Sequence, residues 1–329
     1  MGMDKIIGLG NALVDVLATL DNDDLLRELD LPKGGMTLID GDRLERVNSR
    51  LEHMPTHRAT GGSASNTIAA LAALGTPTAF IGQVGRDSYG DFFRHCLQGR
   101  GTDDHLIVSQ TLPSGVATTF ISPDGERTFA THLGAAAALR ADDLKAELFE
   151  GCHTLYVEGY LVQDHDLILQ AIRLAKAAGL QVCLDLASYT VVREERNFFH
   201  QLLTQYANIV LANEEEARAF TEREPEGALV ELAGLCGMAV VKVGSRGALL
   251  RRGSEEACVP AQTVSHVVDT TGAGDFFAAG LLYGLACGFP LERCGRIGAK
   301  TAAEVIQVIG TTLPSSKWEE IKEWIEINH

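Results

Sequence analysis

Positive charge is scarce in this sequence. Lys and Arg number 28 against 44 Asp and Glu, which gives the 329 residues a formal net charge of −16. Nucleic acids and anionic membrane surfaces are bound through clustered Lys and Arg, so this balance argues against both kinds of partner. It does not argue against a single nucleotide, because one local anion site can act against the overall field.

Long apolar runs and paired cysteines are also missing. No stretch reaches about 18 continuous apolar residues, and the start of the chain, Met1 to Ile7, has no signal-peptide core. The seven cysteines are widely spaced and contain no Cys-x-x-Cys pair. An odd, scattered set favours reduced thiols over a disulfide framework or a zinc site. We therefore expect a cytoplasmic protein.

The residues that are present suit a folded α/β protein, with 46% hydrophobic and 22% charged residues. From Thr154 onward, short apolar runs alternate with segments of helix length. This rhythm predicts a mostly parallel sheet covered by helices on both faces, with ligands beyond the carboxyl ends of the strands. Residues 106–132 instead alternate in the manner of a hairpin around a Pro-Asp-Gly turn.

One stretch in the last third of the chain carries the strongest chemical signal. The β-prone pair Val267–Val268 leads to Gly272, Ala273, Gly274 and Asp275, where a helix opens. Glycines let the backbone approach a ligand, and the first N–H groups of a helix attract anions. We predict that these amides hold a phosphate, while the acid takes a proton from an attacking hydroxyl.

Simpler interpretations of this stretch remain open from the residues alone. Gly-x-Gly also begins a dinucleotide-binding motif, but the third glycine of that motif is Phe277 here, which makes an NAD enzyme a poor fit. Asp275 could also be a first-turn acid that is favoured only by the helix dipole.

Two strings resemble the signatures of one family. Asp269-Thr270-Thr271-Gly272-Ala273-Gly274-Asp275 is similar to the C-terminal signature of ribokinase-like (PfkB) sugar and nucleoside kinases, and Gly61-Gly62-Ser63-Ala64-Ser65-Asn66 is similar to the N-terminal one. The similarity extends from about Ile7 to Pro314. The strings at 10–15 and 212–217 look most like the adenosine kinase branch.

The resemblance implies a ribokinase-like α/β fold over residues 1–329, with a doubly wound, mostly parallel sheet flanked by helices. A small β-sheet lid would be inserted through the segments 12–20, 33–40 and 112–131. No internal repeat, low-complexity segment or flexible linker divides the chain.

The implied activity is transfer of the γ-phosphate of ATP, with Mg²⁺, to a primary hydroxyl of a nucleoside, and the adenosine branch favours adenosine converted to AMP. Lys300 and Met36 depart from the residue types of that branch. A sugar kinase for ribose, fructose or a keto-deoxy sugar acid therefore stays open. So does a non-catalytic nucleoside or sugar sensor that keeps the fold, although Asp275 speaks against it. Both a monomer and a homodimer remain compatible with the residues.

Several site residues combine local chemistry with the resemblance. Asp15 is an acid among aliphatic neighbours, and a buried acid must be paired or liganded. Asn66 can donate to and accept from a hydroxyl, although it could equally cap the helix that follows. The family uses such residues to hold the acceptor substrate. The substrate-binding residues implied are Asn11, Asp15, Met36, Gly61, Gly62, Asn66 and Tyr160, with Tyr189 as a second aromatic candidate.

The remaining residues belong to the phosphate side. Asn213 and Glu216 have capping-box spacing, which the family also uses to reach Mg²⁺ through water. Arg127 stands where related nucleoside kinases carry an arginine that reaches the transferring phosphate, although a solvated hairpin arginine is the alternative. The resemblance implies Asn213, Lys242, Gly244, Gly247 and Thr271 for the nucleotide, and Asp269, Thr271 and Gly310 for a monovalent cation such as K⁺.

Overall fold

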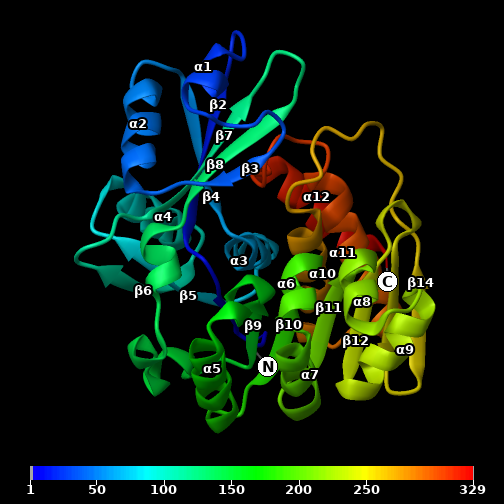
Figure 1. Cartoon of the computed structure of the whole chain (residues 1–329). Helices are drawn as coiled ribbons and strands as arrows, with labels where there is room; N and C mark the ends of the chain where they lie inside the picture. Colours follow the sequence, from blue (N-terminus) through cyan, green and yellow to red (C-terminus); the bar gives the residue numbers. More distant parts are fainter. Residues whose placement is uncertain (1–2, 329) are drawn as a thin grey trace.

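The computed structural model describes residues 3–328, which form one large and one small sheet with helices around them (Figure 1). The strands of the large sheet are β1 (Ile6–Leu9), β5 (Thr78–Gly85), β6 (Thr102–Ser109), β9 (Thr154–Glu158), β10 (Gln181–Asp185), β11 (Ile209–Asn213), β12 (Met238–Lys242), β13 (Ala248–Arg252) and β14 (Glu255–Val259). Those of the small sheet are β2 (Leu13–Thr19), β3 (Met36–Leu38), β4 (Thr56–Gly61), β7 (Gly115–Ile121) and β8 (Arg127–His132).

Twelve α-helices lie within the described residues. They are α1 (Asp24–Glu28), α2 (Gly41–Leu51), α3 (Ser63–Leu74), α4 (Ser88–Gly99), α5 (His165–Ala177), α6 (Tyr189–Glu194), α7 (Arg196–Gln205), α8 (Glu214–Thr221), α9 (Pro225–Leu235), α10 (Ala273–Ala286), α11 (Leu291–Val305) and α12 (Ser315–Ile327). As Figure 1 shows, α1 and α2 accompany the small sheet, while the remaining helices surround the large one.

The large sheet runs in the order β14-β13-β12-β11-β10-β9-β1-β5-β6. All neighbours from β12 to β6 are parallel, and only the hairpin strands β13 and β14 at one edge are antiparallel. Successive residues of a strand enter different cores: Ile6 packs into one and Ile7 into the other. A sheet covered on both faces needs such continuous apolar strands, which confirms the predicted fold class.

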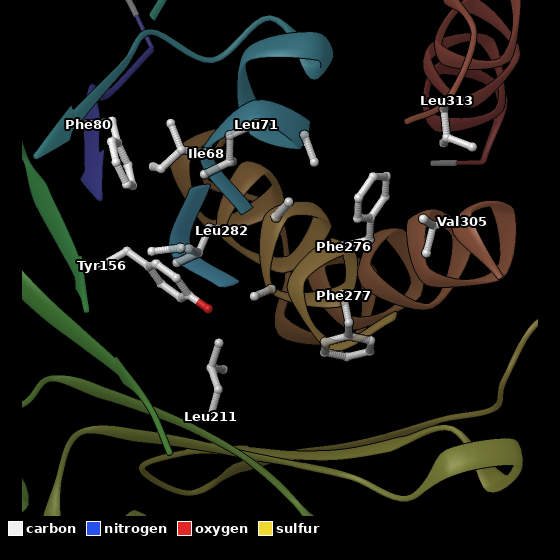
Figure 2. Close-up of a cluster of buried hydrophobic side chains, with 14 of the residues drawn as sticks. Ile68, Leu71, Phe80, Tyr156, Leu211, Phe276, Phe277, Leu282, Val305 and Leu313 are labelled. Carbon is white, nitrogen blue, oxygen red and sulfur yellow. The ribbon is translucent and has the colours of Figure 1, made fainter. Parts of the chain in front are cut away.

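The two cores lie on opposite faces of the large sheet. Residues of α5, α7 and α9 fill one, and residues of α3, α10 and α11 fill the other. Figure 2 shows Ile68 of α3 beside Phe80 of the sheet and Leu282 of α10 beside Tyr156, and all four belong to the same core. Helix α10 lies very close to α11, because a Cβ on Gly280 would come within 2.5 Å of the Thr301 hydroxyl oxygen. This packing fixes α10, the helix that begins at the predicted phosphate-binding turn.

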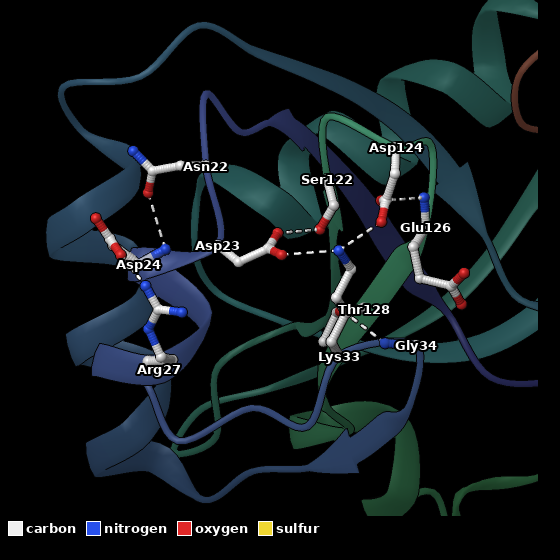
Figure 3. Close-up of polar contacts among 10 residues, drawn as sticks. All are labelled: Asn22, Asp23, Asp24, Arg27, Lys33, Gly34, Ser122, Asp124, Glu126 and Thr128. Carbon is white, nitrogen blue, oxygen red and sulfur yellow. Dashed lines mark hydrogen bonds and ion pairs between the residues drawn. The ribbon is translucent and has the colours of Figure 1, made fainter.

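The small sheet has the order β3-β8-β7-β2-β4. At its far end, Lys33 Nζ lies 2.7 Å from carboxylate oxygens of both Asp23 and Asp124, and the Ser122 hydroxyl donates to the other oxygen of Asp23 at 2.6 Å (Figure 3). These contacts join residues 23–33 to the turn at 122–124, about a hundred positions later in the sequence. Because such exposed ion pairs are each worth at most about 1 kcal/mol, they orient the loops more than they stabilise the fold.

Some local predictions need correction. Residues 106–109 lie in β6, parallel to β5 of the large sheet, so the hairpin begins only at β7. Val267 and Val268 are 57% and 44% exposed and form no strand. The small sheet also contains β4, which the sequence did not predict. That sheet includes strands from all three expected lid segments, but its action as a lid remains a prediction.

The sequence predicts neither disulfide bonds nor membrane-spanning helices. All seven cysteines are free thiols, as expected for a protein without a disulfide framework. Among residues 3–328, no helix combines the length and the apolar character that a membrane crossing demands.

Candidate active site

Two cavities open at the carboxyl edge of the large sheet. The first, which we call the polar cavity, has a volume of about 620 Å³ and is lined by Ser63, Tyr160, Asp185, Ala187, Asn213, Glu214, Glu215, Glu216, Lys242, Gly244, Gly247, Gly272, Ala273, Gly274, Asp275, Phe277 and Ala302. It thus brings together the predicted phosphate-binding turn and all but one of the residues predicted to hold the nucleotide. Thr271 is the exception.

The second, which we call the apolar cavity, has a volume of about 600 Å³. It is lined by Asn11, Leu13, Met36, Leu38, Gly62, Ser63, Thr131, Leu133, Ala136, Ala137, Leu139, Arg140, Glu158, Tyr160, Leu161, Gln163, Asp164, Leu167, Thr190, Val191 and Glu194. Ser63 and Tyr160 line both cavities, so the two spaces meet at these side chains. Strands β3 and β8 of the small sheet supply part of the wall.

Asp275 lies beside this junction, in the first turn of α10. The Ser63 hydroxyl donates to its Oδ1 at 2.7 Å, and the Asn66 amide donates to its Oδ2 at 2.9 Å. Burial raises the pKa of Asp275 to about 6, against the lowering effect of these hydrogen bonds. The carboxylate is therefore oriented by α3 and is largely ionised at neutral pH.

The turn before α10 has the backbone of an anion site. Gly272 caps the helix with φ of 76°, a left-handed conformation that favours glycine. The Ala273 N–H is already bonded to the Thr270 carbonyl at 3.2 Å. Within residues 3–328, the N–H groups of Gly272 and Gly274 have no acceptor, which leaves these two amides to receive an anion.

Asn66 was predicted to hold a substrate hydroxyl. In the structure its Nδ2 contacts Asp275, its Oδ1 accepts from the Thr311 hydroxyl at 3.1 Å, and it lines neither cavity. Asn66 therefore positions the Asp275 carboxylate, and direct substrate binding by Asn66 stays a prediction. Ser63 lay inside the N-terminal signature but was not singled out, since no local pattern places it against α10.

Buried charges surround one end of the polar cavity. Lys242 Nζ lies 3.2 Å from Asp185 Oδ2, and both side chains are largely enclosed. Burial by itself lowers the pKa of Lys242, but Asp185 and Glu216 outweigh burial and raise it. Lys242 therefore stays charged. The sequence did not identify Asp185, although an acid that ends a buried strand at this edge was a usable signal.

Asn213 and Glu216 form the predicted capping box. The Asn213 Oδ1 accepts from the Glu216 N–H at 2.8 Å, and Glu216 Oε2 accepts from the Asn213 N–H at 2.8 Å. Burial raises the pKa of Glu216. No group of three or more metal-binding side chains occurs within residues 3–328. The acids of this cavity fit Mg²⁺ held through its waters better than direct ligation.

Glu158 is a further buried acid that the sequence did not identify as a site residue. It is 1% exposed, and its carboxylate accepts hydrogen bonds from the Asn11 N–H at 2.9 Å, the Asn11 amide at 2.6 Å and the Ala64 N–H at 2.9 Å. Burial raises its pKa to about 7. Glu158 thereby joins the end of β1 to the start of α3 at the apolar cavity.

Asp15 and Gly61 pack against each other in the small sheet. A Cβ at Gly61 would lie 2.2 Å from Asp15 Oδ1, so any other residue at this position would displace the Asp15 carboxylate. Burial, followed by the charge of Asp275, raises the pKa of Asp15 to about 7. Neither residue lines a cavity in the structure, so their contact with a substrate is still only predicted.

Arg127 reaches from β8 to Asp269 in the loop before α10. Its Nη1 donates to Asp269 Oδ2 at 2.6 Å. The same carboxylate accepts from the N–H groups of Thr271 at 3.0 Å and Gly310 at 2.7 Å. The charge of the predicted monovalent-cation site is thus paired with the Arg127 guanidinium, and binding of K⁺ by Asp269, Thr271 and Gly310 stays a prediction.

The outer residues are less constrained. Met36, Tyr160 and Tyr189 are 63%, 47% and 45% exposed; the first two line cavities and Tyr189 lines neither.

Two residues near the predicted nucleotide site have structural roles. Gly247, with φ of 103°, would place a Cβ 1.9 Å from the Val259 carbonyl oxygen, so glycine is needed for the turn itself. Lys300 forms an ion pair with Glu304 of the same helix.

Comparison with known proteins places this geometry in a family. Residues 30–318 match the model of the pfkB family carbohydrate kinases. The chain is 26% identical to a 5-dehydro-2-deoxygluconokinase of Shouchella clausii (strain KSM-K16), over 92% of this chain and 97% of that protein.

Solved structures agree in fold. A probable sugar kinase from Rhizobium etli CFN 42 superimposes with a TM-score of 0.86 at 35% identity, covering 98% of this chain and 99% of that one. The adenosine kinase from Sinorhizobium meliloti gives a TM-score of 0.85 at 35% identity, covering 98% of this chain and 100% of that one. Sugar kinases and adenosine kinases thus both occur among the similar proteins.

Proposed function

The chain belongs to the pfkB family of carbohydrate kinases, and from this membership we propose that it transfers the γ-phosphate of ATP to a primary hydroxyl of a nucleoside, with adenosine giving AMP as the favoured reaction. Kinases of this family use ATP, usually with Mg²⁺. The observation that carries the proposal is the meeting of a polar and an apolar cavity at Ser63 and Tyr160, beside Asp275. ATP would occupy the first cavity and the acceptor the second.

In this proposal Asp275 removes the proton of the attacking hydroxyl. Its pKa of about 6 keeps it ionised near neutral pH and makes it a stronger base than an ordinary aspartate. Ser63 and Asn66 hold the carboxylate, while the amides of Gly272 and Gly274 stabilise the charge of the transferring group.

The polar cavity would supply the remaining positive charge. Lys242 lies on its wall, and Asn213 with Glu216 would orient Mg²⁺ through water. When bound, Mg²⁺ neutralises phosphate charge and orients the phosphates for transfer. Arg127 is proposed to contribute with those guanidinium N–H groups that Asp269 does not occupy.

The acceptor side supports a nucleoside. Leucine and alanine side chains form much of the apolar cavity, and such walls suit the faces of a purine better than a small polyhydroxylated sugar. Met36 and Leu38 project from β3, so the small sheet would close over the acceptor and exclude water, which otherwise competes as phosphate acceptor. Asn11, Asp15 and Gly62 would then approach the ribose.

A sugar acid is the second candidate, because a 5-dehydro-2-deoxygluconokinase is among the similar proteins and Arg140 lines the apolar cavity. A carboxylate ligand needs a free cation. Arg140 Nη1 already donates to the carbonyls of Ala137 at 3.0 Å and Leu139 at 2.9 Å and lies 3.4 Å from Asp164 Oδ2, so its charge already has a partner, which favours the nucleoside over the acid.

The deciding experiment measures ADP release from ATP and Mg²⁺ with adenosine, other nucleosides, ribose, fructose and 5-dehydro-2-deoxygluconate as acceptors. We expect adenosine to give the highest kcat/KM. Activity on sugars alone would overturn the nucleoside assignment. Inactivity on every acceptor, together with ligand binding in calorimetry, would instead support a non-catalytic sensor.

A further inference from the structure

One ion pair connects the small sheet to the anion-binding turn. Arg127 lies on β8, and Asp269 lies 142 positions later in the loop that precedes α10. Their side chains are 20% and 6% exposed, so the pair is screened from solvent far more than the ion pairs at the far end of the small sheet. A buried carboxylate requires such a partner, since an unpaired one costs several kcal/mol.

The Asp269 carboxylate also organises the backbone around the turn. Its Oδ1 accepts from the Thr271 N–H, one residue before Gly272, and its Oδ2 accepts from the Gly310 N–H in the loop after α11. Burial acts to raise the pKa of Asp269, but the Gly310 and Thr271 amides and the Arg127 guanidinium together lower it. The acid is therefore ionised, and its charge helps to hold the turn in place.

A charge at this position can be balanced in two ways. A monovalent cation would need open oxygen atoms on the carboxylate, whereas a guanidinium brings both a charge and directed N–H donors. In this chain Arg127 Nη1, at 2.6 Å, occupies the oxygen that also receives the Gly310 amide. The position of the counter-charge is therefore filled by the protein itself.

We propose that the Arg127 guanidinium takes the place of a monovalent cation at Asp269, so that the anion-binding turn of this chain is organised without K⁺. The inference goes beyond the proposed reaction and does not depend on which acceptor the enzyme uses. Arg127 is in this respect a positioning residue that acts on the turn through Asp269, whatever it contributes to the phosphate.

The first test measures thermal unfolding in KCl, NaCl and choline chloride at equal ionic strength. We expect the same unfolding midpoint for the wild type in all three salts. Arg127→Ala should unfold at a lower temperature in choline, because Asp269 loses its partner, and K⁺ should raise its midpoint by binding to the freed carboxylate. A K⁺-specific rise in the wild type would overturn the proposal, and so would an Arg127→Ala protein that K⁺ leaves unchanged.

A matched control is the Arg94–Asp104 pair, which has an Nε–Oδ2 distance of 2.6 Å and joins α4 to β6 away from both cavities. Arg94→Ala removes an arginine from a similar pair and should show no K⁺-specific effect. If Arg127→Ala does not fold, the wild-type salt series still decides the matter, and Asp269→Asn in the wild type removes the charge that requires a partner. The double variant Asp269→Asn/Arg127→Ala should fold and show no K⁺ response. A K⁺ response in this double variant would contradict the inference.

The second test uses ADP release. Wild-type kcat should be the same in K⁺ and in choline, whereas K⁺ should raise the kcat of Arg127→Ala by at least about fivefold, the lower range of typical coupling between two sites. An activation of the wild type of that size would contradict the inference. Because the unfolding measurements need no turnover, a wrong acceptor assignment would leave them interpretable.

Discussion

The polar and apolar cavities share Ser63 and Tyr160 but are built to bind by different means. The polar cavity balances charges: Lys242 faces Asp185, the amides of Gly272 and Gly274 have no acceptor among residues 3–328, and buried acids lie nearby. The apolar cavity offers shape, with leucine and alanine walls and one buried acid, Glu158, that ties its backbone together. In the proposed assignment, electrostatics would therefore fix the phosphate donor, while packing would select the acceptor.

Asp275 lies beside the place where the two cavities meet, so removing its charge should slow the reaction and leave ligand binding in both cavities unchanged. We expect Asp275→Asn to lower kcat by about 10²–10⁴-fold, the usual range for a lost general base, with little change in either KM. Steady-state kinetics and calorimetric binding of each ligand would measure this. Near-normal turnover would show that the carboxylate at the junction is not the base.

Lys242 tests the charge balance of the polar cavity. Lys242→Met leaves Asp185 and Glu216 buried without their cation, and we expect a loss of about 3–5 kcal/mol in the free energy of unfolding at pH 8. The loss should shrink at pH 5, because the raised pKa of Glu216, about 7, leaves that acid protonated there. Urea unfolding at both pH values would check it. The control is Lys176→Met, whose Nζ contacts only the neutral Asn208 amide at 2.6 Å; an equal loss there would contradict the argument.

Asp15 should lower the stability of the wild type at high pH, because it is a buried acid that feels the charge of Asp275. Its pKa is raised to about 7, so between about pH 4 and pH 7 the native state binds more protons than the unfolded state. The stability from this group therefore falls as pH rises through that window. Asp15→Asn should be more stable than the wild type at pH 8 by about 1–3 kcal/mol, while its KM for the acceptor rises.

Urea unfolding at pH 4 and pH 8 would test the sign for Asp15. The gain should vanish at pH 4, where the wild-type acid is protonated. Asp166→Asn on the surface of α5 serves as a control and should change stability little at either pH. A gain for Asp15→Asn that is equal at the two pH values would contradict the electrostatic cause.

The walls of the two cavities allow a reciprocal test. Ala137→Phe narrows the apolar cavity and should raise KM for the acceptor by about tenfold, or 1.4 kcal/mol, while KM for ATP stays the same. Ala302→Phe narrows the polar cavity and should do the reverse. Initial rates with one substrate varied at a time measure both values. If either variant raised both KM values equally, the two cavities would not be separate sites.

Much of the fold could be predicted because it rests on local patterns. Continuous apolar strands followed by helices gave the parallel sheet, and Gly75, with φ of 98°, ends α3 as expected. The errors occurred in segments whose local sequence does not indicate which sheet they join or whether they form a strand. Residues 106–109 are all half-buried and show no alternation, and β4, with three exposed residues, one half-buried residue and two buried ones, shows no clear period of two.

The site residues likewise include some that local sequence determines and some that only the tertiary structure brings together. The glycines before Asp275 and the capping box of Asn213 and Glu216 follow from conformational preferences and hydrogen bonds within a few residues, so the sequence by itself determined them. The contacts of Ser63 with Asp275 and of Arg127 with Asp269 join residues 212 and 142 positions apart. Only the packing of α3, α10 and the small sheet around the large sheet decides such pairs, because a charge is paired by whatever the tertiary structure brings within reach.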